Sequence, residues 1–277
     1  MTEEEFERIY RLLKTQYGIN LERKKEIVKG RLENYVRLGG YSSYTAYLNA
    51  VEADATGRLK QQLINLLTTN HTFFMREFEH MDFMREEVLP YLRKKEAARK
   101  DLGIWCGAAS TGEEPYMLAM LMNDFFGLEH GEWDTTLLAT DLSTEALKKA
   151  MRGEYTYDQV KNLPDTWKRR YFKSRDNGEH FEVTKEIKDQ IFFRQFNLMD
   201  PFPFRRKFHV VFMRNVMIYF DARDKRRLVQ KIYDYLEPGG YLFVGRTETI
   251  DRNDSGFMMV QPSIFRKPLD SKAKYEK

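Results

Sequence analysis

Two adjacent glutamates, Glu113 and Glu114, follow a small-residue turn in the stretch "IWCGAASTGEEPYMLAM", residues 104–120. This pattern predicts a buried strand, a glycine turn and a helix, an arrangement that often binds nucleotides but can also simply turn the chain. No lysine is present to meet a phosphate, and two carboxylates at a helix N-terminus would repel a pyrophosphate. S-adenosylmethionine, which carries a ribose, an ammonium and a sulfonium but no phosphate, would fit. Glu113 alone is also explained as a favourable charge in the first helical turn.

Further polar residues stand where apolar strands end. Asp141 follows "LLAT", where an acid can bind ribose hydroxyls, although it could instead cap the next helix. Asn197 and Asn215 each follow a strand and can offer amide groups to an adenine, or can simply form turns. Arg214 comes directly after a buried strand, so its guanidinium needs an anionic or π-rich partner.

A third group lies upstream in "TTNHTFFMRE". Asn70, Thr72 and Arg76 fall within about two helical turns of one another. They can contribute to the same site, although Thr69 or Asn70 would also serve as the cap of a connecting helix.

The elements before residue 70 are predicted to be helices. Thr2 and Glu5 have capping-box spacing, and Gly18 ends the first helical period. In the second segment, residues 21–40, the predicted apolar side consists of Leu21, Ile27, Leu32 and Val36. Its predicted outer face is basic and consists of Arg23, Lys24, Lys25, Lys29, Arg31 and Arg37. We therefore expect a four-helix domain over residues 1–70, followed by a connecting helix and polar linker over residues 71–100.

From residue 101 onward, short apolar runs alternate with helical periods, which predicts an α/β domain with a mostly parallel sheet over residues 101–277. Asp221 is predicted to cap a helix that Pro238, Gly239 and Gly240 end. Residues 165–189 break the alternation, and their "DNG" turn predicts an inserted hairpin, so a small β-subdomain is expected at about 165–190.

Composition excludes several classes of protein. The 277 residues are 42% hydrophobic and 32% charged, without a run of about 18 apolar residues that would span a membrane. An acidic, helical N-terminus and a single cysteine, Cys106, favour a cytoplasmic protein. A net charge of +4 does not demand a nucleic-acid partner, and the five scattered histidines predict no metal site.

Five motifs carry a resemblance to a known family. "LTTNHTFFMRE", "STGEEPYMLAM", "ATDLSTEALKKA", "RNVMIYFD" and "PGGYLFVGRTE" occur in an order and spacing similar to those of the CheR family of chemotaxis receptor glutamate methyltransferases. The resemblance implies a helical domain, a linker, and a class I S-adenosylmethionine-dependent (Rossmann-like) methyltransferase domain with an antiparallel β-subdomain. It also implies methyl transfer to glutamates of chemoreceptor cytoplasmic domains for sensory adaptation, giving γ-methyl esters and S-adenosylhomocysteine.

The resemblance also assigns roles to particular residues. The implied cofactor-binding residues are Asn70, Thr72 and Arg76 from the linker, Glu114 at the methionine moiety, Asp141 at the ribose, Asn197 and Leu198 at the adenine, and Arg214 and Asn215 near the reactive end. The implied catalytic residues are Arg76, Arg214 and Tyr219. The basic second helix is then a possible docking face for membrane-bound receptors, without insertion into the membrane. "KSRDNGEHFEV" replaces the glycine-rich turn expected of members that tether a receptor's C-terminal peptide, which puts tethering in doubt.

The implied reaction is direct displacement of the sulfonium methyl by a receptor carboxylate. A glutamate with a pKa near 4.3 is already ionised at pH 7, so no general base is needed. Two alternatives stay open. One is a methyltransferase for another substrate, although "RNVMIY" lacks the paired prolines typical of amino-methylating enzymes. The other is a cofactor-sensing scaffold that binds receptors without turnover.

Overall fold

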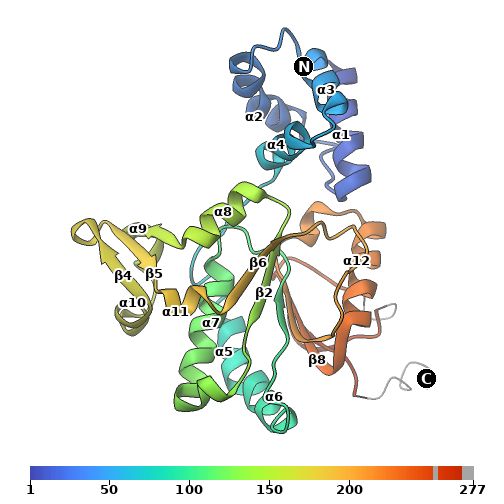
Figure 1. Cartoon of the computed structure of the whole chain (residues 1–277). Coiled ribbons are helices and arrows are strands. Elements are labelled where there is room, and N and C mark those ends of the chain that lie inside the picture. Colours follow the sequence, from blue (N-terminus) through green and yellow to red (C-terminus); the bar gives the residue numbers. More distant parts are fainter. Residues whose placement is uncertain (252–254, 270–277) are drawn as a thin grey trace.

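The computed structural model describes residues 1–251 and 255–269, and Figure 1 shows a small helical domain standing on a larger sheet domain. The helical domain consists of α1 (Glu3–Tyr17), α2 (Lys25–Leu38), α3 (Tyr44–Ala53) and α4 (Arg58–Leu67). The four predicted helices are confirmed. Thr2 and Glu5 form the predicted capping box, and Gly18 ends α1 in the left-handed region at φ 71°.

The apolar face of α2 differs from the prediction. Val28, Leu32 and Val36 are its buried residues, whereas Ile27 is 51% exposed. The helix begins at Lys25, so its buried stripe follows a four-residue spacing from Val28, and Ile27 is rotated out of the core.

The segment after α4 is irregular for longer than predicted. The connecting helix begins only at α5 (Glu79–Phe83) and continues through a π-helical turn, η1 (Met84–Val88), into α6 (Leu89–Lys95). Met75 and Glu77 have left-handed backbones, at φ 69° and 49°, which interrupt any helix before that point. The interpretation of Asn70 as the cap of the connecting helix is therefore wrong.

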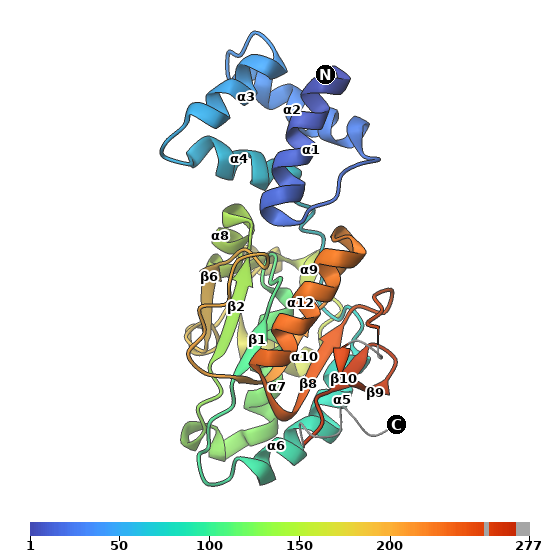
Figure 2. The ribbon, with the colours of Figure 1, turned by 90° about the vertical axis from the view of Figure 1, so that its right-hand side faces the viewer.

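The core of the larger domain is a seven-stranded sheet in the order β6-β2-β1-β7-β8-β10-β9 (Figure 2). Its five parallel strands are β6 (Ile191–Gln195), β2 (Leu137–Asp141), β1 (Ile104–Cys106), β7 (Phe208–Met213) and β8 (Leu236–Val244). Its antiparallel edge consists of β10 (Ile264–Arg266) and β9 (Met258–Gln261). Because β1 lies between β2 and β7, the direction of strand order reverses beside β1, which is where ligands bind in such sheets.

Helices cover both faces of this sheet. In Figure 1, α5 and α7 (Glu113–Phe126) lie on one face and α12 (Ala222–Tyr235) on the other. The side chains of β1 alternate accordingly: Ile104 and Cys106 pack with the first layer, and Trp105 packs with the second. The shorter helices beside the sheet are η2 (Gly127–Glu132), α8 (Thr144–Arg152) and η4 (Met217–Tyr219).

The ends of α12 agree only in part with the prediction. Asp221 caps the helix by accepting a hydrogen bond from the Asp224 amide, as predicted. The helix ends at Tyr235, however, and Pro238, Gly239 and Gly240 lie inside β8. The pairing register between β7 and β8 shifts there, so the glycines form an irregularity in a strand rather than a helix stop.

The predicted hairpin is present as β4 (Phe172–Arg175) and β5 (His180–Val183), joined by the turn η3 (Asp176–Gly178). A third strand, β3 (Glu154–Thr156), pairs with β5 and lies before the predicted range. The helices around this small antiparallel sheet are α9 (Tyr157–Val160), α10 (Asp165–Tyr171) and α11 (Lys185–Lys188). Within the described part of the chain, none of the helices is both long and apolar enough to cross a membrane.

Candidate active site

A cavity of about 1330 Å³, its open mouth included, lies at the carboxyl ends of the parallel strands, beneath the helical domain. All ten residues selected from the sequence line it: Asn70, Thr72, Arg76, Glu114, Asp141, Asn197, Leu198, Arg214, Asn215 and Tyr219. They come from the linker, from α7, from the ends of β2, β6 and β7, and from η4. Residues up to about 150 positions apart in the chain thus meet in one space.

Asp141, at the end of β2, is 8% exposed and is held by the backbone. Its carboxylate accepts the Ser110 amide at 2.8 Å and the Ser143 amide at 2.8 Å. Burial raises the pKa of Asp141, while these amide hydrogen bonds oppose the rise. The side chain of Ser143, not that of Asp141, caps α8. The helix-cap alternative for Asp141 is therefore wrong.

The two glutamates of the "GEEP" stretch point in different directions. Glu114 lines the cavity, where its carboxylate pairs with Arg214 and accepts a hydrogen bond of 3.0 Å from the Cys106 thiol. Glu113 is 1% exposed and accepts the Thr111 hydroxyl at 2.7 Å. Burial raises the pKa of Glu113. Only one acid of this pair therefore faces the cavity.

Arg214 has the anionic partners that its position requires. Its guanidinium pairs with Glu114 and with Glu77, the latter at 3.2 Å, and donates to the main-chain carbonyl of Arg76 at 2.6 Å. Both carboxylates raise the pKa of Arg214 against the effect of burial. Sequence reasoning missed Glu77, because nothing in "FMREFE" indicates which of its charged side chains turns inward.

Glu248 is a second group that sequence reasoning missed. It is 4% exposed, and its carboxylate accepts the Asn215 amide at 2.8 Å and the Gly245 amide at 2.6 Å. A Cβ atom on Gly245 would lie 2.4 Å from Nδ2 of Asn215, so the ends of β7 and β8 approach too closely for another residue there. Asn215 itself is left-handed at φ 58°, which agrees with the turn-forming alternative.

The turn after β6 is fixed from two sides. The Asn197 amide group donates to the Gln16 carbonyl of α1 at 2.9 Å, and its oxygen accepts the Met199 amide at 3.1 Å, so the turn-forming alternative also holds here. The ammonium of Lys231 donates to the carbonyls of Leu198 at 2.5 Å and Asp200 at 2.8 Å.

Arg76 and Tyr219 lie at the mouth of the cavity. The Arg76 guanidinium donates to the His71 carbonyl at 3.0 Å and stands 5.7 Å from the Phe73 ring centre. The Tyr219 ring lies 5.4 Å from the Lys24 ammonium, and its carbonyl accepts the Asn20 amide at 2.8 Å.

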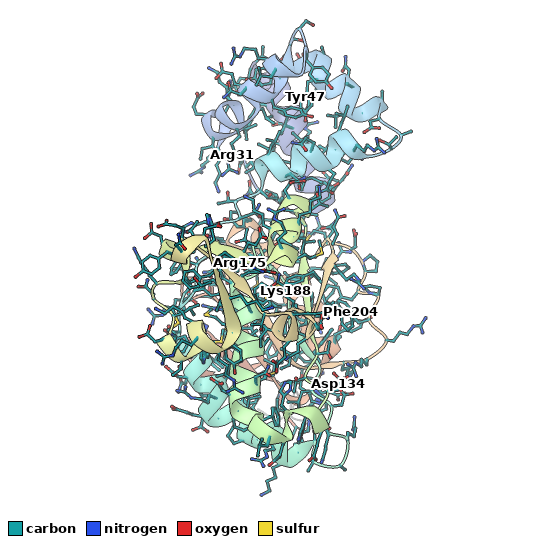
Figure 3. All side chains as sticks on the ribbon, turned by 60° about the vertical axis from the view of Figure 1, so that its left-hand side comes forward. Arg31, Tyr47, Asp134, Arg175, Lys188 and Phe204 are labelled. Carbon is teal, nitrogen blue, oxygen red and sulfur yellow. The ribbon has the colours of Figure 1, made fainter. Side chains whose placement is uncertain are left out.

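The helical domain supplies a wall that sequence reasoning did not anticipate. This wall consists of Tyr17, Ile19, Leu21, Lys24, Ile27, Val28 and Arg31. Arg31, which was predicted on the outer basic face of α2, instead binds the residues that follow α4, just before the linker. Its guanidinium donates to the carbonyls of Leu67 at 2.9 Å and Thr68 at 3.1 Å and to the Thr69 hydroxyl at 2.9 Å. Figure 3 labels Arg31 in the half of the helical domain that faces the sheet domain.

The donors and acceptors of this cavity fit S-adenosylmethionine. Asp141 offers carboxylate oxygens where a ribose would lie, and Gly107, Ala108 and Ser110 of the turn after β1 line the same cavity. The one buried cation of the described cavity wall, Arg214, is compensated by the carboxylates of Glu114 and Glu77, so the buried part of the wall offers no unpaired cation to a phosphate. No three His, Cys, Asp or Glu side chains among residues 1–251 and 255–269 are placed to hold a metal ion.

A mostly parallel sheet of this order, with an acid closing the second strand and a cavity above the switch point, defines an S-adenosylmethionine-dependent methyltransferase. Residues 70–265 match the family model described as CheR methyltransferase, SAM binding domain, and residues 4–68 match CheR methyltransferase, all-alpha domain. The chain therefore belongs to the CheR methyltransferase family.

Relatives agree along nearly the whole chain. The chain is 35% identical over 272 residues to the chemotaxis protein methyltransferase of Borreliella burgdorferi, covering 96% of this chain and 95% of that protein. It is 32% identical over 264 residues to chemotaxis protein methyltransferase Cher2 of Pseudomonas putida, covering 94% and 95%. It is also 32% identical over 270 residues to the chemotaxis protein methyltransferase of Escherichia coli, covering 96% and 91%.

Proposed function

We propose that this enzyme transfers a methyl group from S-adenosylmethionine to glutamate side chains in the cytoplasmic domains of membrane-bound chemoreceptors. The observation that carries the proposal is the meeting of ten residues from the linker, α7, η4 and three strand ends in one cavity. Membership of the CheR family adds the class of reaction. The working units we propose are residues 1–70, the linker 71–100 and the methyltransferase domain 101–277.

The roles proposed for the cavity residues are those that the resemblance to the CheR family implies, and the chemistry of each side chain suits its role. Asp141 accepts the ribose hydroxyls, and Asn197 and Leu198 flank the adenine at the turn that Lys231 holds. Glu114 accepts the ammonium of the methionine moiety. Asn70 and Thr72 close the cavity from the linker side, where Ser110 Oγ donates to the Asn70 carbonyl at 2.8 Å.

S-adenosylmethionine supplies a methyl group on a cationic sulfur that leaves as the neutral sulfide of S-adenosylhomocysteine when a carboxylate oxygen takes the methyl. The chain therefore has to position a carboxylate and exclude water, and no proton needs to move. Holding the two reactants in line can contribute roughly 7–11 kcal/mol where it is fully realised. Arg76 and Tyr219, at the mouth of the cavity, are the groups we propose to hold the incoming carboxylate.

Receptor docking is proposed for the exposed part of the basic face of α2. Arg31 binds residues 67–69 and Lys25 pairs with Glu3, so neither is a free cation. Lys29 on α2 and Arg23 in the turn before it form no ion pair with another described residue, and an acidic receptor surface would be attracted to them.

The test is incubation with methyl-labelled S-adenosylmethionine and receptor-containing membranes. Label that mild alkali releases as methanol is expected, because a carboxyl ester hydrolyses and an N-methyl group does not. Label that survives alkali would favour a methyltransferase for another substrate. Cofactor binding without any labelling would favour a cofactor-sensing scaffold.

A further inference from the structure

The charge of the cofactor cavity depends on an acid outside the "GEEP" stretch. Glu113 is turned into the core, so Glu114 is the acid of that pair that lines the cavity. Glu114 is itself paired with the Arg214 guanidinium, which is 6% exposed. One carboxylate and one guanidinium sum to zero, so this pair alone would give a cationic ligand no net negative charge.

Glu77 supplies the missing charge from the linker. Its carboxylate lies 3.2 Å from Arg214 Nη2 and accepts hydrogen bonds from Asn215 Nδ2 at 3.3 Å and from the Arg246 amide at 3.3 Å. Burial opposes ionisation of this group, but the Arg214 charge and these hydrogen bonds outweigh it and lower the pKa of Glu77. Glu77 is therefore ionised at neutral pH.

The backbone around Glu77 is strained to put the side chain there. Met75 and Glu77 both occupy the left-handed region, which costs non-glycine residues free energy and persists only where surrounding contacts hold it. Two contacts do so here, since Arg214 Nη2 also binds the Arg76 carbonyl at 2.6 Å. The second contact also holds the main chain of Arg76, whose side chain lines the cavity.

We propose that Glu77 is a positioning residue that makes the Glu77–Arg214–Glu114 cluster net negative by one charge and so favours the sulfonium form of the cofactor. This proposal rests on the proposed cofactor site. No other buried charge cancels the cluster among the described neighbours. His80 has its pKa lowered to about 4 by burial and is neutral at pH 7, and Arg246 pairs with Glu79 at the surface.

A comparison of the affinities for the cofactor and for its product isolates the effect of this charge on binding. S-adenosylmethionine differs from S-adenosylhomocysteine only by the methyl group on the sulfur and by the positive charge that this methyl gives it. Glu77→Gln removes the charge and keeps the shape of the side chain. We expect the ratio of the dissociation constants, cofactor over product, to rise by at least about threefold at low ionic strength. A role in local structure alone would weaken both ligands equally and leave the ratio unchanged.

Three further variants make the test specific. Glu79→Gln removes an exposed acid two residues away and should leave the ratio as in the wild type. Glu77→Asp keeps the charge, so it should weaken both ligands without changing the ratio. In Glu77→Gln combined with Arg214→Gln, Glu114 alone restores a net charge of minus one, and the ratio should return toward the wild-type value.

Isothermal titration of each purified full-length variant with both ligands, without receptor, gives the answer. An unchanged ratio in Glu77→Gln, or a double variant whose ratio stays raised, would overturn the proposal. If Glu77→Gln does not fold, Arg214→Gln alone still decides it, because the cluster then carries a net charge of minus two and the ratio should fall, whereas an unchanged ratio would overturn the proposal. If neither ligand binds the wild-type protein, the cofactor assignment fails instead, so the two failures are distinguishable.

Discussion

The Ser110 hydroxyl donates a hydrogen bond of 2.8 Å to the main-chain carbonyl of Asn70, and this bond joins the linker to the turn after β1. The Ser110 amide in turn binds Asp141 at 2.8 Å. The linker, the glycine turn and the proposed ribose-binding acid are thus connected through one serine, which places Asn70 over the cavity.

Ser110→Ala should therefore weaken cofactor binding. Loss of one hydrogen bond costs about 0.5–1.5 kcal/mol, which is roughly a twofold to tenfold rise in the dissociation constant for S-adenosylhomocysteine. Ser174→Ala, on the exposed strand β4, is the matched control and should change nothing. Equal affinities for wild type and Ser110→Ala would show that the linker is held in some other way.

Arg31 and Lys29 lie on the same helix but should behave differently. Arg31→Met loses three hydrogen bonds to residues 67–69, so we expect weaker cofactor binding in the absence of receptor. Lys29→Glu combined with Arg23→Glu should leave that affinity unchanged and raise the KM for receptor. The check is titration with S-adenosylhomocysteine beside receptor methylation kinetics. Normal cofactor affinity in Arg31→Met would contradict this role and would favour a role for Arg31 in receptor docking.

Substitutions of the two acids of the "GEEP" stretch should have different effects. Substitution of Glu114 should change cofactor binding, and substitution of Glu113 should change the stability of the fold. Glu114→Gln should weaken cofactor binding by about tenfold or more, since it removes a cavity carboxylate. Glu113→Gln should leave binding within about twofold.

The pH dependence of Glu113→Gln has a definite sign. The raised pKa of Glu113 means that the folded state holds a proton the unfolded state has released. The free energy of unfolding of the wild type relative to Glu113→Gln should therefore fall as pH rises above the ordinary value of 4.5. Urea unfolding of both proteins between about pH 4.5 and pH 7.5 measures this, and a difference that grows with pH would contradict it.

Lys231→Met should loosen the adenine-side turn, because the Leu198 and Asp200 carbonyls lose their donor. Weaker cofactor binding is expected, with Lys225→Met on the same helix as control.

Burial lowers the pKa of Lys231 to about 8 from 10.5, so the unfolded state holds more protons between these values. The free energy of unfolding of the wild type relative to Lys231→Met should accordingly rise between about pH 8 and pH 10.5. A fall over this range would contradict the buried position of the Lys231 ammonium.

Arg76→Ala should reduce methyl transfer more than tenfold at saturating cofactor, because Arg76 lines the cavity and is proposed to hold the incoming receptor carboxylate. Arg175→Ala, on β4, removes another guanidinium, one that does not line the cavity, and should leave turnover unchanged. Near-normal turnover of Arg76→Ala would contradict the proposed role of Arg76 in holding the receptor carboxylate.

Periodicity in the sequence was sufficient for most of the fold. The alternation of apolar runs and helical periods after residue 101 predicted the parallel sheet, and "DNG" predicted the hairpin between β4 and β5. The strand β3 was missed because three residues carry no periodicity. The glycines at 239 and 240 were taken for a helix stop, because a sequence does not reveal that β8 begins at Leu236 before its irregularity.

Site residues that directly follow a strand could be predicted from the sequence. Those whose side-chain direction depends on the tertiary structure could not. Asp141, Arg214 and Asn215 were found because each follows an apolar run. Glu77 was missed because its inward direction depends on left-handed backbone at non-glycine residues, which sequence pattern does not signal. Arg31 was misplaced because helical periodicity distinguishes a polar face from an apolar one, but not a solvated face from one that contacts another segment.

Receptor incubated with this protein and S-adenosylmethionine carrying a deuterated methyl group can be digested and sequenced by tandem mass spectrometry, which identifies the side chain that gains the methyl. The account predicts the label on glutamate side chains of the receptor cytoplasmic domain, strongly reduced in Arg76→Ala and retained in Arg175→Ala. Label on lysine, arginine or asparagine nitrogen, or none on receptor despite tight cofactor binding, would contradict it.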